Sequence, residues 1–168
     1  MTALQSRNLA YAIALGVPAT LIAAVYVAQY GFYLAPCEMC WWQRYAHFAA
    51  IALAAIGWAL RGKGSAGDSV IIAAGATILA AGLIGGFHAG VEYHWWQGLT
   101  ACSSTRITGD PLAAIMDSPL VRCDTAAWTL FGVSLAGYNF LVSTVTAFAV
   151  FILLARGHAA LPARKVPA

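Results

Sequence analysis

A long uncharged segment lies near the start of the chain, between Arg7 and Glu38. Its apolar part, residues 9–30, is long enough to cross the roughly 30 Å hydrocarbon core of a bilayer as a helix. Three further apolar segments follow, at residues 42–60, 69–89 and 130–155. The sequence therefore predicts an all-α membrane protein in which residues 1–168 form one integral membrane domain, a four-transmembrane-helix bundle.

The composition excludes most soluble functions. Hydrophobic residues make up 61% of the chain and charged residues only 9%, whereas soluble domains carry roughly a quarter charged residues. The net charge of +3 comes from basic residues that do not form a run. A nucleic-acid partner is therefore not expected, and the expected surroundings are membrane lipid.

The basic residues predict how the chain is oriented in the membrane. Six of them, Arg7, Arg61, Lys63, Arg156, Arg164 and Lys165, fall on one side of the expected helices, and three, Arg44, Arg106 and Arg122, fall on the other. Basic residues accumulate on the cytoplasmic side, so both termini are expected there. The first apolar segment exceeds an ordinary signal-peptide core, which favours a retained anchor helix over a cleaved leader.

This orientation places the loops at residues 31–41 and 90–129 on the exported side. All four cysteines lie in or beside these loops. An oxidising compartment favours disulfide chemistry over a metal site, so no metal is expected. Within the second loop, residues 111–120 carry apolar side chains at helical spacing behind Pro111. They predict either a short helix on the outer membrane surface or a loop segment packed on the bundle.

The first cysteine pair, Cys37 and Cys40, stands in "PCEMCWWQR", where a helix is expected to begin near Cys40. A helix N-terminus favours a thiolate. Arg44 follows one turn later, and we expect its charge to be the main cause that lowers the pKa of Cys40. A stabilised thiolate makes the disulfide a stronger oxidant.

Electrons accepted at the membrane edge need an acceptor there, and a lipid-soluble quinone fits because its head group can sit at that depth. Arg44 can hydrogen-bond a quinone carbonyl. The alternative is that Arg44 only anchors the helix by reaching lipid phosphates.

The second pair, Cys102 and Cys123, lies in "ACSSTRITGDPLAAIMDSPLVRCD". Small and polar neighbours indicate a mobile, accessible disulfide that a partner's thiolate can attack. The alternative is a structural cross-link worth roughly 3 kcal/mol. Neither pair alone decides the function.

Four stretches together resemble a known family: "PCEMCWWQR", "HAGVEYHWW", "TACSS" and "VRCDTAAWTLFGVSLAGYNF". They are similar to the disulfide bond formation protein B (DsbB) family over nearly the whole chain. The outer-loop cysteines are closer together than in the best-known form, which indicates a shorter-loop bacterial branch. The resemblance implies a bacterial inner-membrane, quinone-dependent thiol oxidase.

The resemblance also implies roles for the cysteines. Cys102 would be attacked by a periplasmic thioredoxin-like dithiol oxidase of the DsbA type, which leaves Cys102 and Cys123 reduced. Cys123 would then attack Cys37. Cys40 would emerge as a thiolate that faces the quinone, and closure of the Cys37–Cys40 disulfide would send two electrons into it.

Two further residues match family positions near the quinone, which is ubiquinone or menaquinone. Arg44 matches the family's quinone-side arginine, and His88 is the best positional match to its histidine. The remaining histidines, His47 and His94, are expected to be structural, although His47 can face the quinone pocket.

Two other functions remain open on the sequence. The first is a structural membrane protein whose four cysteines bind zinc or lock the fold. The second is a small b-type cytochrome that uses His47 and His88.

Overall fold

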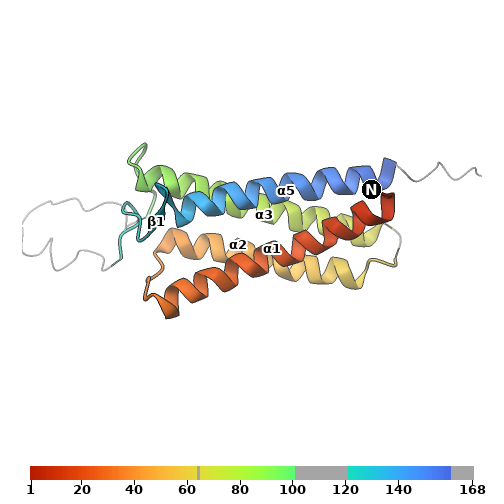
Figure 1. The fold of residues 1–168 in the computed structure, drawn as a ribbon, viewed down its shortest axis with the longest axis horizontal. Helices are drawn as coiled ribbons and strands as arrows, with labels where there is room; N and C mark the ends of the chain where they lie inside the picture. The colour runs from red at the N-terminus through yellow and green to blue at the C-terminus, as the bar shows by residue number, and fades with distance from the viewer. Residues whose placement is uncertain (64, 101–120, 160–168) are drawn as a thin grey trace, which may run out of the picture.

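Four long helices make up most of the structure, a computed structural model that describes residues 1–63, 65–100 and 121–159. They are α1 (Ala3–Gly31), α2 (Glu38–Ala59), α3 (Ala66–Glu92) and α5 (Leu135–Ala159). The helices run along one another in an elongated bundle (Figure 1). Each apolar segment of the sequence forms most of one helix, as hydropathy over such lengths predicts.

The bundle closes as a ring of neighbours: α3 packs against α2 and α5, while α1 packs against those same two helices from the other side. The core is rich in alanine, with fully buried Ala10, Ala14, Ala50, Ala54, Ala74 and Ala147. Small side chains let helices approach closely in membranes. Gly85 serves the same purpose, because an added Cβ would lie 2.9 Å from both the Ala136 carbonyl oxygen and Asn139 Nδ2.

Among the described residues, three helices are long and apolar enough to cross a membrane, namely α1, α3 and α5. Helix α2 differs because its first half carries Gln43, Arg44 and His47, all of them buried. The four-span count therefore stays a prediction, while an all-helical membrane bundle apart from one short hairpin is confirmed. The segment expected to form a surface helix, residues 111–120, lies outside the described residues.

A two-stranded hairpin occupies the position where the last helix was expected to begin. Strands β1 (Thr129–Leu130) and β2 (Val133–Ser134) pair antiparallel. Phe131 and Gly132 form the turn with φ of 50° and 78°, which is the left-handed geometry of a tight hairpin. The Tyr93 hydroxyl donates to the Gly132 carbonyl at 2.8 Å and accepts from the Ser134 N–H at 2.9 Å. Helix α5 therefore begins at Leu135 instead of near residue 130.

A buried carboxylate ties three helices together at the end of the bundle opposite this hairpin. Asp68 of α3 is 4% exposed. Its Oδ1 accepts hydrogen bonds from Arg7 Nε at 2.7 Å and from the Tyr11 hydroxyl at 2.6 Å, both on α1. Its Oδ2 lies 2.9 Å from His158 Nε2 of α5. Asp68 thus fixes the helix ends that carry Arg7 and His158.

We expect Asp68→Ala to destabilise the bundle by about 3 kcal/mol, because the buried Tyr11 hydroxyl loses its acceptor and the half-buried Arg7 loses its ion pair. The measurement is the free energy of unfolding in mild detergent. The surface pair Arg122–Asp124 gives the control, Arg122→Ala, which should leave the stability nearly unchanged because exposed ion pairs contribute little. Equal effects from the two variants would show that Asp68 does not join the helices.

Candidate functional site

The Cys37–Cys40 pair forms the start of α2. Cys37 is the N-cap residue, and its Sγ accepts a hydrogen bond from the Cys40 backbone N–H at 3.3 Å. The two sulfurs lie 2.8 Å apart, and both cysteines are free thiols. Hydrogen bonding with Cys40, together with burial, raises the pKa of the Cys37 thiol. The same hydrogen bond lowers the pKa of Cys40, so Cys40 is the thiol of the pair that loses its proton more readily.

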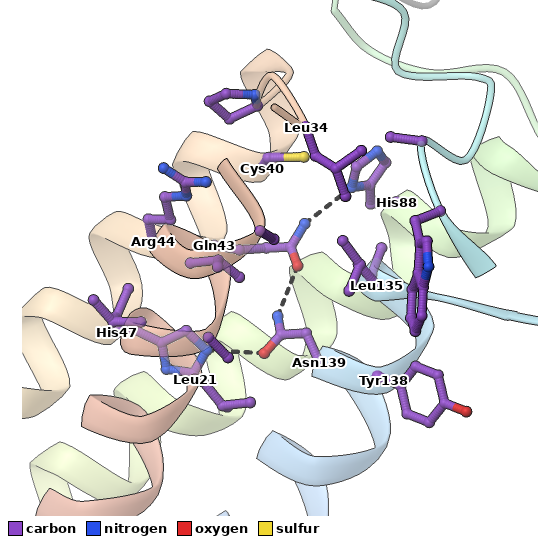
Figure 2. A pocket seen from close by; sticks show the side chains of 18 of the residues that line it. Leu21, Leu34, Cys40, Gln43, Arg44, His47, His88, Leu135, Tyr138 and Asn139 are labelled. Atoms are coloured by element: carbon purple, nitrogen blue, oxygen red, sulfur yellow. Dashed lines mark hydrogen bonds between the residues drawn. The ribbon is translucent and has the colours of Figure 1, made fainter. Parts of the chain in front are cut away.

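Arg44 is placed differently from our expectation. Its Nη1 donates to Gln29 Oε1 of α1 at 2.6 Å, and its guanidinium stacks over the rings of Trp41 and Tyr26 at 4.9 and 5.3 Å. The Cys40 sulfur and this guanidinium point to opposite sides (Figure 2). The prediction that Arg44 is the main cause lowering the pKa of Cys40 is wrong, because the hydrogen bond from Cys37 contributes most and the Arg44 charge contributes least.

A chain of polar side chains crosses the bundle below the cysteines, as the dashed lines in Figure 2 show. Gln43 Nε2 lies 3.0 Å from His88 Nδ1. Asn139 Nδ2 donates to Gln43 Oε1 at 2.7 Å, and Asn139 Oδ1 lies 2.8 Å from His47 Nε2. The chain therefore joins α2, α3 and α5 in an otherwise apolar interior.

Gln43 and Asn139 were not identified from the sequence as site residues. The available signal was a polar side chain inside an apolar segment, which in a membrane protein marks a candidate functional position. His47, considered mainly structural, belongs to this chain, whereas His94 is exposed and lies outside it.

His88 lies at the junction between the polar chain and the first cysteine pair. Its side chain is 3% exposed, and its Nε2 is 3.5 Å from Cys37 Sγ and 3.6 Å from Glu92 Oε1. Ligand atoms of Cys37, Cys40 and His88 all lie within 4.8 Å of one another. Thiolate and imidazole are ligands that zinc accepts, so this cluster has the donor set of a metal site as well as of a redox site.

The second cysteine pair is represented by Cys123, since Cys102 lies outside the described residues. Cys123 is disulfide-bonded. It is fully buried and packs in one cluster with Cys37, Met39 and Val91. The expectation of an accessible disulfide is therefore wrong for Cys123. The shared cluster places Cys123 close to the first cysteine pair.

A cavity of about 380 Å³ lies between α1, α2, α5 and the hairpin. Pockets of this size suit small organic ligands. Most of its wall is apolar, from residues such as Leu21, Val25 and Leu135, and its polar wall includes Cys40, Gln43, Arg44, His47, His88 and Asn139. Cys40 and Arg44 thus share the cavity although they do not point toward each other.

Three comparisons with known proteins bear on this arrangement. No curated protein and no solved structure shows a significant match to the chain. The sequence model of the family described as "Disulfide bond formation protein DsbB" matches residues 6–153. That match includes most of every helix and all four cysteines, and the chain therefore belongs to the DsbB family of membrane-bound disulfide bond formation proteins.

Proposed function

We propose that this protein is a quinone-dependent thiol oxidase that reoxidises a periplasmic dithiol oxidase of the DsbA type. The observation that carries the proposal is the position of the first cysteine pair. Cys37 belongs to the same buried cluster as Cys123, while Cys40 lines the apolar cavity. One pair therefore lies between the second pair and a ligand-sized space.

In this proposal electrons enter through Cys102 and Cys123. The partner's thiolate attacks Cys102, and its second thiol completes the exchange, which leaves Cys102 and Cys123 as thiols. The Cys123 thiolate then attacks Cys37 and releases Cys40 as a thiolate. The shared cluster of Cys123 and Cys37 supports exchange between the two pairs, because exchange requires the two sulfurs to meet.

The cavity beside Cys40 fits a quinone head group, because its wall is mostly apolar and includes polar side chains such as Gln43 and Arg44 that can orient a ligand. A bound ubiquinone or menaquinone would accept two electrons and two protons there. The residues that would hold it are Arg44 and His88. Arg44 supplies a fixed cation in the cavity wall, since Gln29 and the ring of Trp41 hold its guanidinium.

The proposed location is the bacterial inner membrane, with both termini in the cytoplasm and the cysteines on the periplasmic side. The distribution of basic residues supports this orientation. Arg7 donates to the Arg61 carbonyl at 2.9 Å, so two of the basic residues behind this orientation lie at the same end of the bundle.

We expect Cys40→Ser to abolish quinol formation, because the sulfur that faces the cavity is lost. The assay combines the purified protein in lipid nanodiscs with a reduced DsbA-type partner and quinone. The same variant should still exchange one disulfide with the partner in a single turnover, which serves as its internal control. Quinol formation at the wild-type rate would contradict the assignment of Cys40.

We expect Arg44→Ala to raise the KM for quinone, because it removes a hydrogen-bond donor with a full charge from the cavity wall. Such a bond contributes roughly 1.5–3 kcal/mol, which corresponds to about a 10- to 100-fold change. Quinone titration at saturating partner measures it. Arg44→Lys keeps the charge and loses the planar stacking, so its KM for quinone should lie between those of the wild type and Arg44→Ala. An unchanged KM in both variants would remove Arg44 from the quinone site.

Topology can be tested with cysteines introduced at the two ends of the bundle in a background without native cysteines. Tyr33→Cys, at a side chain that is 86% exposed, should react with a membrane-impermeant maleimide in intact spheroplasts. Lys63→Cys, in the turn between α2 and α3, should react only after the membrane is opened. The reverse pattern would place the native cysteines in the cytoplasm.

A further inference from the structure

The polar chain has a fixed direction because two backbone carbonyls anchor its amides. Asn139 Nδ2 donates to the Ala81 carbonyl at 2.9 Å, so the other hydrogen of that NH₂ group reaches Gln43 Oε1 and Oδ1 faces His47. Gln43 Nε2 donates to the Met39 carbonyl at 3.2 Å, so its second hydrogen faces His88. A carbonyl oxygen can only accept, and neither amide can therefore be turned over without loss of a hydrogen bond.

This direction determines the tautomer of His88. Because Gln43 presents an N–H to Nδ1 at 3.0 Å, Nδ1 must be the acceptor nitrogen. In a neutral imidazole the other nitrogen then carries the proton. That nitrogen, Nε2, lies 3.5 Å from Cys37 Sγ, so the chain aims an N–H at the sulfur.

We propose that His88 donates its Nε2–H to the Cys37 sulfur whenever that sulfur carries charge. Gln43 and Asn139 are the positioning residues that fix this tautomer of His88. The inference rests on the proposed function and deepens it, since it assigns His88 to the sulfur as well as to the cavity wall. It also works against a metal at Cys37, Cys40 and His88, because a metal needs Nε2 without its proton.

Cys37 carries charge in one interval of the proposed reaction. When the Cys102 thiolate attacks Cys123 in a Cys37–Cys123 disulfide, the Cys102–Cys123 disulfide forms again, and the electron pair of the broken bond stays on Cys37. The Cys37 thiolate would then bond to the Cys40 sulfur, with a bound quinone as the acceptor of the two electrons. Overall, two thiolates, one quinone and two protons give one disulfide and one quinol. The Nε2–H remains on His88 throughout and stabilises the Cys37 anion.

Among the described residues, the groups that face His88 are Cys37, Cys40, Gln43, Glu92 and the Cys123 backbone. Two of them compete with the Cys37 sulfur as acceptors: Glu92, whose Oε1 lies 3.6 Å from Nε2, and the Cys123 backbone. Glu92→Gln removes the competing carboxylate, so this variant should not slow the reactions of Cys37.

The test needs neither quinone nor partner, so its outcome is independent of the proposed function. A protein with Cys37 as its single cysteine, made with Cys40→Ser, Cys102→Ser and Cys123→Ser, is alkylated over a range of pH. Adding His88→Phe should raise the pKa of Cys37 by about 1 and slow alkylation below that pKa about tenfold. His88→Gln, whose amide N–H can reach the place of Nε2, should restore most of the rate.

His94→Phe is the matched control, because His94 is exposed near the same end of the bundle and should leave the rate unchanged. Nitrogen-15 NMR of His88 reads the tautomer directly, with Nε2 protonated in the parent and a mixture of tautomers in Gln43→Leu. Protonation at Nδ1 in the parent would overturn the inference, and so would an alkylation rate that His88→Phe leaves unchanged in folded protein. If His88→Phe does not fold, the NMR result and His88→Gln still decide the question.

Discussion

The hydrogen bond between Asn139 and Gln43 is the interaction on which the arrangement of the site depends. It joins α5 to α2 across an apolar interior at 2.7 Å, where no bulk water competes for either amide. Both side chains are anchored by backbone carbonyls, at Ala81 and at Met39. The orientations of His88 and His47 follow from these bonds, because each ring completes a hydrogen bond that an amide has already directed.

The helical segments and the reactive pair were predictable because both are properties of local sequence. Long apolar runs decide the helices, and a Cys-x-x-Cys ahead of such a run decides the position of the pair. The contact between Gln43 and Asn139 was not predictable, since it joins residues 96 positions apart and depends on how each helix is rotated. The hairpin was not predicted for another reason. Its turn holds Phe131 at φ 50°, and in the sequence "LFGV" only Gly132 indicates such a left-handed turn.

Two predictions about environment were wrong for instructive reasons. Small polar neighbours indicated an accessible Cys102–Cys123 disulfide, but its Cys123 side chain packs in a cluster with Met39 and Val91 and has no exposed surface. The spacing of Arg44 from Cys40 indicated contact on one helix face. At the start of a helix the first-turn sulfur turns toward its cap instead, while the long arginine side chain reaches Gln29 and two aromatic rings.

The position of Cys37 links helix geometry to redox state. Its sulfur occupies the place that serine or aspartate takes at most helix starts, and it accepts the N–H of Cys40 there. Along the proposed path that same sulfur changes its covalent neighbour twice in every catalytic cycle. An anionic sulfur accepts a stronger hydrogen bond than a sulfur in a disulfide, so the strength of this helix cap would follow the bonding state of Cys37.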